Sequence, residues 1–199
     1  MTKAIVFDIG GVLVMLDQKR CIEAFKSILG FDRITELLDP YVQKGIYGEL
    51  EEGTLPPEEF RARVLAESRP GSRPEDVDRC MYALLDGVTE STVSAVKSVA
   101  GRYPLYILSN NNPISMVFCQ QAMDKAGIGN LFTDKFISCD MKMLKPSEAF
   151  YREVIRRVGA APEEIVFIDD SLVNVQAARA VGIDARWLEP GMPLSQLLP

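Results

Sequence analysis

Asp8 stands between an apolar run and two glycines, in the segment VFDIGGVLV at residues 6–14. A buried strand that ends in this acid would carry a carboxylate to the edge of a sheet, and the glycines let the backbone turn tightly around it. Such a carboxylate can attack phosphorus in line and form an aspartyl-phosphate. The alternative is an Asp that caps a loop, because acids are frequent in turns.

A second segment, LSN at residues 108–110, ends another apolar run in small polar residues. The Ser109 hydroxyl, followed by a free N–H at Asn110, can bind a phosphate oxygen, and the helix expected after Pro113 would add its positive end. A Ser-Asn pair is also common in turns, so this segment indicates a loop under either interpretation.

Lys145 lies in a third segment, LKP at residues 144–146. We expect Pro146 to open a helix at its first turn and Lys145 to point across the end of the sheet. A fixed cation there would offset negative charge on Asp8 and on a phosphoryl group. The alternative is a solvated lysine, in a stretch that also contains Lys142.

The fourth segment, FIDD at residues 167–170, ends in adjacent carboxylates. Asp169 and Asp170 would repel one another unless a cation lay between them, and carboxylate oxygens suit Mg²⁺ in octahedral geometry. We expect Asp170 to be a direct ligand together with Asp8, and Asp169 to bind directly or through water. The alternative is an acidic turn that caps the next helix.

In this order, the four segments resemble the motif set of the haloacid dehalogenase (HAD) superfamily, in its phosphatase branch. The resemblance implies an α/β fold, with a HAD-like Rossmannoid parallel sheet core and an α-helical cap inserted after strand one. It further implies that Asp8 is nucleophile and metal ligand, and that Mg²⁺ is the cofactor. Ser171 and Asn174 fit the DDSxxN pattern, in which they support the loop.

Gly10 departs from the usual pattern, in which this residue is a second Asp that acts as general acid and then as base. Glycine has no group for proton transfer, although its backbone carbonyl can still bind the metal as in the family. The resulting DxGG motif is similar to that of a subgroup resembling α-glucose-1-phosphatases. A sugar 1-phosphate fits this departure, because its anomeric oxygen needs less acid catalysis than a primary alkoxide.

Short apolar runs predict the strands of a parallel sheet that is covered on both faces. The predicted strands span residues 4–7, 105–108, 136–138, 165–168 and 185–188. Between the later runs, helical patterns cover residues 88–100, 114–126, 147–158 and 172–181. This alternation indicates an α/β sheet with right-handed crossovers.

Residues 16–87 interrupt the alternation and contain no good strand pattern. Amphipathic patterns there predict helices at 18–29, 33–46, 57–68 and 74–85. We therefore expect a core domain of residues 1–15 and 88–199 and a helical cap subdomain of residues 16–87. Because ligands bind at the carboxyl ends of parallel strands, an insertion after strand one is placed to act as a lid.

Composition excludes several classes of site. The 199 residues carry a net charge of −6 and include no histidine, which rules out Ser-His-Asp triads and His-based zinc sites. An acidic chain without a Lys/Arg cluster argues against nucleic acid and anionic membranes as partners. The 4 cysteines form no CxxC pair and are expected to be reduced and buried. No apolar stretch is long enough to span a membrane, so we expect a cytoplasmic protein.

The leading hypothesis is a Mg²⁺-dependent phosphomonoester hydrolase that acts on a small phosphorylated metabolite. In it, Asp8 and Lys145 are catalytic, and Ser109, Asn110 and Lys145 bind the phosphoryl group. One alternative is a 2-haloacid dehalogenase, against which the Asp169-Asp170 pair argues. Another is a binding or regulatory protein whose catalysis is weakened by Gly10.

Other polar residues have no assigned role at this point. We interpret Asp17 as the N-cap of the helix at 18–29 rather than as a catalytic acid. The insertion carries further polar residues that the sequence does not rank as substrate contacts: Tyr47, Glu49, Glu51, Glu52, Arg61 and Arg63. Neither the substrate nor the oligomeric state follows from the sequence.

Overall fold

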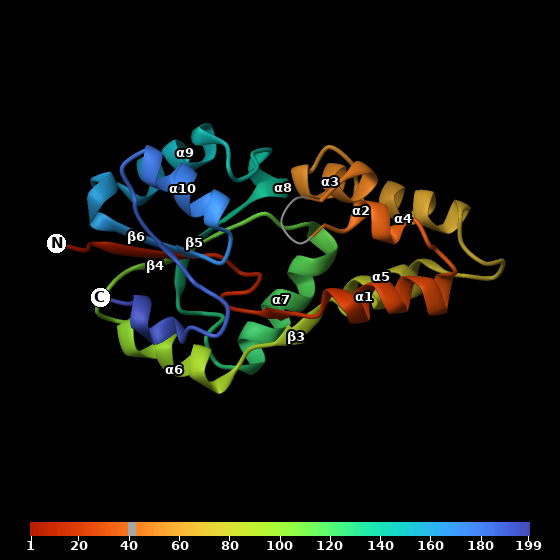
Figure 1. Ribbon diagram of the computed structural model, residues 1–199, viewed down its shortest axis with the longest axis horizontal. Helices are drawn as coiled ribbons and strands as arrows, with labels where there is room; N and C mark the ends of the chain where they lie inside the picture. Colours follow the sequence, from red (N-terminus) through yellow and green to blue (C-terminus); the bar gives the residue numbers. More distant parts are fainter. Residues whose placement is uncertain (40–42) are drawn as a thin grey trace.

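A five-stranded parallel sheet forms the centre of one half of the protein, and a group of helices forms the other half (Figure 1). The computed structural model describes residues 1–39 and 43–199. The strand order is β5-β4-β1-β6-β7. These strands are β1 (Ala4–Phe7), β4 (Leu105–Ser109), β5 (Phe132–Ile137), β6 (Ile165–Asp169) and β7 (Asp184–Trp187).

Helices cover both faces of this sheet, because successive side chains of each strand point to opposite faces. Ile5 and Phe7 of β1 pack on the face covered by α6 (Glu90–Val99) and α7 (Pro113–Lys125). Ala4 and Val6 face the other side, which α9 (Glu148–Val158) and α10 (Leu172–Ala180) cover. Figure 1 shows α9 and α10 on one side of the strands and α6 on the opposite side. The predicted three-layer α/β fold is confirmed.

The sheet brings the polar segments of the sequence to one edge. Phe7 of β1 is in register with Ile107 of β4 and with Ile168 of β6. The residues that follow these partners, among them Asp8, Ser109 and Asp169, therefore leave the sheet side by side. This is the end of the sheet that faces the helical half in Figure 1.

The helical half has a hydrophobic core of its own. Its elements are α1 (Gln18–Ala24), a π-helix at Phe25–Leu29, α2 (Ile34–Leu37), α3 (Gly45–Glu52), α4 (Pro57–Ala66) and α5 (Pro74–Tyr82). Phe25, Leu50, Phe60 and Val77 are among its buried members, and Ile114 of α7 joins them from the other half. This cluster, whose buried members other than Ile114 all belong to the insertion, supports our proposal that residues 16–87 form a cap subdomain.

Two short strands at the junction of the halves contradict the expectation that the insertion has no strand. β2 (Met15–Leu16) pairs antiparallel with β3 (Leu85–Gly87), where the chain enters and leaves the cap. The helix predicted at 74–85 therefore ends early, at Tyr82.

Three other predicted boundaries are also wrong. The helix predicted at 33–46 is not continuous, because α2 ends at Leu37 and α3 begins at Gly45; residues 40–42 lie outside the described part of the chain. The strand predicted at 136–138 is Phe132–Ile137, and Ser138 begins the short helix α8 (Ser138–Met141). Pro146 does not open a helix, since α9 begins at Glu148 after the N-cap Ser147.

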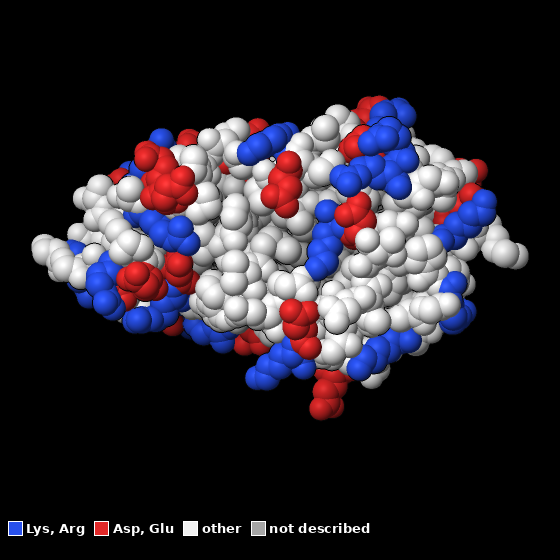
Figure 2. Space-filling model, turned by 180° about the vertical axis from the view of Figure 1, so that it is seen from behind, with Lys and Arg blue, Asp and Glu red and all other residues white. Residues whose placement is uncertain are grey.

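The four cysteines are buried and form no disulfide, as expected for thiols that act as small hydrophobic residues. In the part of the chain that the structure describes, no helix is both long and apolar enough to cross a membrane. Figure 2 shows Lys and Arg interspersed with Asp and Glu on the face seen there, without one continuous basic surface. The absence of nucleic-acid partners remains a prediction.

Replacing Asp17 with Ala should destabilise the protein by about 1 kcal/mol, the usual cost of losing an N-cap. The Asp17 carboxylate accepts a hydrogen bond from the Arg20 N–H at 2.9 Å and caps α1. Urea denaturation would measure the change in the free energy of unfolding. Asp17→Asn keeps an acceptor and should stay close to wild type; equal losses in both variants would contradict the capping role.

Candidate active site

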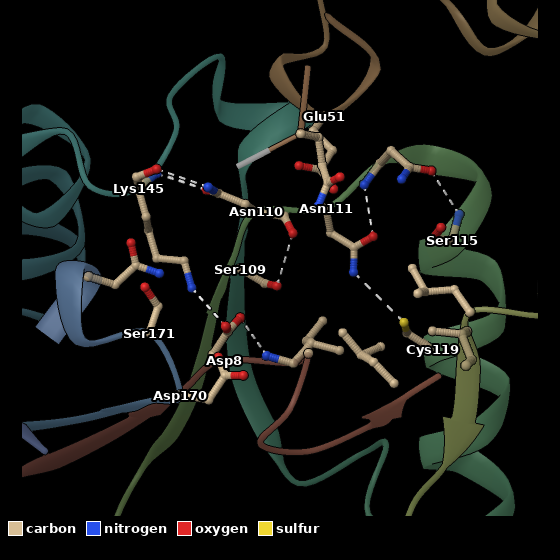
Figure 3. Close-up of a pocket in the computed structure, with 18 of the residues that line it drawn as sticks. Asp8, Glu51, Ser109, Asn110, Asn111, Ser115, Cys119, Lys145, Asp170 and Ser171 are labelled. Carbon is tan, nitrogen blue, oxygen red and sulfur yellow. Dashed lines mark hydrogen bonds and ion pairs between the residues drawn. The ribbon is translucent and has the colours of Figure 1, made fainter. Parts of the chain in front are cut away.

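A cavity of about 100 Å³ lies between the carboxyl edge of the sheet and the cap (Figure 3). It is lined from the sheet side by Asp8, Gly10, Ser109, Asn110, Lys145 and Asp170, and from the cap side by Gln43, Tyr47 and Glu51. With the exception of Asp169, which is completely buried, every predicted site residue borders this cavity.

Lys145 joins two of the predicted acids. Its Nζ lies 3.0 Å from Asp8 Oδ2 and 2.6 Å from Asp169 Oδ2, and its side chain is 1% exposed. Burial by itself would lower the pKa of Lys145, but the two carboxylates outweigh it and raise the pKa above the ordinary value. Lys145 is therefore a fixed cation between β1 and β6, and its interpretation as a solvated side chain is wrong.

Asp169 already has a full set of protein partners. Besides Lys145, its carboxylate accepts hydrogen bonds from the Ser171 N–H at 2.8 Å and from the Asn174 amide at 3.1 and 3.2 Å. Ser171 and Asn174 thus support the loop after β6, as the DDSxxN pattern implies. These bonds fix Asp169 in place behind the cavity wall.

Asp170 borders the cavity and lies against Gly11. A Cβ on Gly11 would stand 2.2 Å from Asp170 Oδ2, and Gly11 has a φ of +71°. The second glycine after Asp8 is therefore required by both backbone conformation and space. Burial, followed by the neighbouring charge of Asp169, raises the pKa of Asp170 to about 6.

Asp8 has the most perturbed environment of the acids at this edge. Its Oδ1 accepts a hydrogen bond from the Ile9 N–H at 2.7 Å. Burial raises the pKa of Asp8 to about 7, the charge of Lys145 opposes the rise, and the charges of Asp169 and Asp170 add to it. Carboxylate oxygens of Asp8, Asp169 and Asp170 lie within 4.8 Å of one another, close enough to share a metal ion.

The side chain of Asn110 positions Lys145. Its Oδ1 accepts from the Lys145 N–H at 2.8 Å, and its Nδ2 donates to the Lys145 carbonyl at 2.9 Å. The amide group is therefore not available to a ligand, whereas the backbone N–H of Asn110 donates to no described residue. Ser109 Oγ faces the same cavity and lies 3.4 Å from the Asn110 carbonyl, and a hydrogen bond from Ser109 acts to lower the pKa of Asp8.

The structure separates the polar residues of the insertion. Tyr47 and Glu51 on α3 border the cavity, whereas Arg61 pairs with Asp78 at 2.7 Å and Arg63 pairs with Glu49 at 3.3 Å outside it. Burial, followed by the charge of Asp8, raises the pKa of Glu51 to about 8, against the opposing effect of Lys145.

Several residues of the site were not identified from the sequence, because no local pattern marks them as functional. Ser138 accepts a hydrogen bond from the Asn111 N–H at 2.9 Å and donates one to the Glu51 carbonyl at 2.6 Å. It thereby joins the loop after β4 to the cap. Gln43 of the insertion and Ser115, in the first turn of α7, also border the cavity, and neither belongs to one of the four motifs. Whether these core residues meet Gln43 and Glu51 depends on how the cap docks, which no local pattern reports.

Comparison with known protein families shows to which family the chain belongs. The family of haloacid dehalogenase-like hydrolases matches residues 2–182. The chain belongs to this family. As a HAD-like hydrolase, it holds the acids of its first and fourth motifs together at one edge of the sheet, as the resemblance implied.

Similar proteins cover the whole chain. A D-ribitol-5-phosphate phosphatase of Bacteroides thetaiotaomicron is 30% identical over 201 residues, covering 100% of this chain and 97% of that protein. A HAD family enzyme of the same organism, solved with magnesium and inorganic phosphate, has a TM-score of 0.88 at 29% identity and 100% coverage of both chains. A HAD-like hydrolase structure from Porphyromonas gingivalis has a TM-score of 0.85 at 32% identity, covering 96% of this chain and 93% of that one.

Gly11→Ala should destabilise this HAD-like hydrolase more than Gly159→Ala does. Both glycines have nearly equal φ values, +71° and +72°, but nothing lies within 4 Å of a Cβ at Gly159. Each variant bears the cost of a left-handed alanine, about 1–2 kcal/mol, and Gly11→Ala also displaces Asp170, for about 1–3 kcal/mol more. Denaturant unfolding would compare the two, and equal losses would rule out the contact with Asp170.

Proposed function

We propose that this protein is a Mg²⁺-dependent phosphomonoesterase that acts through an aspartyl-phosphate on Asp8. The observation that carries the proposal is the Asp8 carboxylate at the cavity, with Lys145 at 3.0 Å on one side and Asp170 nearby on the other. A nucleophilic carboxylate, a fixed cation and a second acid for a metal are what phosphoryl transfer to a carboxylate needs.

The acids fit a magnesium ion. Asp8 and Asp170 would hold it directly, together with the backbone carbonyl of Gly10, because both carboxylates border the cavity. Asp169, whose oxygens are taken by Lys145, Ser171 and Asn174, would act through water or by orienting Lys145. A dication beside Asp8 and Asp170 favours their charged forms and would offset the burial that raises their pKa values. When bound, it supplies positive charge for the phosphoryl oxygens.

The remaining donors would hold the phosphoryl group. The Ser109 hydroxyl and the backbone N–H of Asn110 lie at the end of β4, next to Lys145. The loop continues to Asn112, which caps α7 by accepting from the Ser115 N–H at 2.9 Å. Donors of this kind near a helix N-terminus suit an anion.

The reaction then has two displacements at phosphorus. The Asp8 carboxylate oxygen attacks, and the bond from phosphorus to the ester oxygen breaks as the alcohol leaves. Water next attacks the aspartyl-phosphate, which returns the Asp8 carboxylate and releases phosphate. Lys145 holds its positive charge throughout, because carboxylates on both sides stabilise the ammonium.

The substrate we propose is a small phosphorylated sugar or polyol. A cavity of about 100 Å³ favours a small ligand, and the similar phosphatase of Bacteroides thetaiotaomicron is named for D-ribitol 5-phosphate. The sugar 1-phosphate inferred from Gly10 remains a prediction. The two classes differ in the oxygen that leaves, anomeric or primary, so a direct comparison decides between them.

Asp8→Asn should abolish phosphate release, by about 10⁴-fold or more, because the variant lacks the nucleophile. The assay measures phosphate from D-ribitol 5-phosphate, glucose 1-phosphate and glucose 6-phosphate with Mg²⁺. Asp17→Asn, an acid in the N-cap of α1, is the control and should keep wild-type turnover. Retained activity in Asp8→Asn would refute the aspartyl-phosphate.

Removal of divalent metal with EDTA should stop phosphate release, and added Mg²⁺ should restore it, because Asp8 and Asp170 hold the ion in the proposed site. The same treatment tests the dehalogenase alternative. Halide release from a 2-chloro acid that survives EDTA would favour that activity. Binding of Mg²⁺ and phosphate without turnover of any substrate would favour a binding protein.

A further inference from the structure

We propose that Glu51, on cap helix α3, is the general acid and base of the reaction and fills the role for which Gly10 has no side chain. The inference rests on the proposed phosphatase function. It assigns a catalytic residue to the cap, whereas Asp8, Lys145 and Asp170 all belong to the core.

Position 10 does not accommodate an acid without rearrangement. A Cβ on Gly10 would stand 3.0 Å from Cδ1 of Leu16, tighter than an ordinary contact. Leu16 belongs to β2 at the junction with the cap and borders the cavity as well. The Leu16 side chain would have to move aside for a larger residue at position 10, and Gly10 itself carries no group that could donate a proton.

Glu51 reaches the same cavity from the opposite side. Figure 3 shows Glu51 on the cap side and Asp8 on the sheet side, with Ser109 and Asn110 between them. Its carboxylate makes no hydrogen bond or ion pair with any other residue in the described ranges, 1–39 and 43–199. An uncommitted carboxylate that faces the nucleophile is available to the leaving group and to water.

The end of α3 is fixed to the core, which keeps Glu51 in place. The Ser138 hydroxyl donates to the Glu51 carbonyl at 2.6 Å, and Lys142 Nζ donates to the Gly53 carbonyl. Gly53 lies so close that a Cβ there would stand 2.2 Å from the Cys139 carbonyl oxygen. These contacts hold the last turn of α3 against α8, so the Glu51 side chain starts from a rigid backbone.

The environment of Glu51 supports proton donation at neutral pH. Burial and the charge of Asp8 raise the pKa of Glu51 to about 8, so the carboxyl group holds a proton below that pH. General acids work best when their pKa lies near the working pH. Two other titratable groups on the cavity wall are less suited: burial raises the pKa of Cys119 to about 11 and that of Tyr47 well above its ordinary value.

The proton balance closes over one turnover. As Asp8 attacks phosphorus and the ester bond breaks, the Glu51 carboxyl gives its proton to the leaving oxygen, which departs as an alcohol. The Glu51 carboxylate then takes a proton from the water that attacks the aspartyl-phosphate. Breakage of the bond between phosphorus and Asp8 restores the Asp8 carboxylate, and Glu51 is protonated again.

The test is the leaving-group dependence of Glu51→Gln. On D-ribitol 5-phosphate, a primary alkyl ester, kcat/KM should fall by about 10²–10⁴-fold, the usual contribution of a general acid. On p-nitrophenyl phosphate, whose leaving group needs no proton, kcat/KM should fall by less than about tenfold. The kcat should fall on both esters, and phosphoenzyme should accumulate with the nitrophenyl ester, because water then attacks without its base.

Glu52→Gln is the matched control, since Glu52 is the exposed neighbour on the same helix and should behave as wild type on both esters. Glu51→Asp places the acid one methylene further away and should give a smaller loss with the same leaving-group dependence. A thermal melt of each variant checks folding. A fall in kcat/KM for Glu51→Gln that is equal on both esters, or no greater than that for Glu52→Gln, would overturn the inference.

The proposed function fails in a different way. If the wild-type protein releases no phosphate from either ester with Mg²⁺, or if Asp8→Asn keeps turnover, the phosphatase proposal fails and the role of Glu51 fails with it. If wild type is active and Asp8→Asn is inactive, only the Glu51 variants decide the further inference.

Discussion

The buried ammonium of Lys145 between Asp8 and Asp169 is the contact on which the site depends. Removing a charge from water is costly, and such a group persists only when it is paired. Each partner comes from a different element: Asp8 after β1, Asp169 at the end of β6, and Lys145 from the loop before α9, held by Asn110 after β4. The parallel sheet is therefore what makes the ion pairs possible, since it delivers these segments to one edge.

One cation does not balance the charge at that edge. Asp8, Asp169 and Asp170 place carboxylates within 4.8 Å of each other, and Lys145 contacts two of them. The imbalance appears in the raised pKa values of Asp8 and Asp170, for which burial is the largest cause and the neighbouring acids add to it. A divalent cation would reverse this penalty, and a phosphoryl group would then meet positive charge from two sides.

The sequence predicted the core well, because continuous apolar runs and strand-end acids are local signals. It failed where position depends on contacts between distant segments. β2 and β3 have only 2 and 3 residues, too few for a pattern. The phosphoryl contact of Asn110 was assigned to its backbone N–H and stays a prediction, but no local pattern showed that its side chain holds the backbone of Lys145. The sequence did not distinguish Glu51 from the other polar residues of the insertion as a substrate contact, because no local feature reports that the cap turns α3 toward Asp8.

Gly10 illustrates both the local signals that the sequence carries and the distant contacts that it does not. Its identity is local, and it shows that position 10 supplies no proton donor; the proposed donor, Glu51, is visible only after the cap is docked. The clamp that runs from Asn111 through Ser138 to Glu51 ties the loop that would bind phosphate to the helix that would move the proton. A cap that supplies the acid couples chemistry to substrate enclosure, because the donor reaches the leaving oxygen only when α3 rests on α8. This arrangement would confine proton transfer to substrates over which the cap fits, a form of selection that a core Asp at position 10 would not impose.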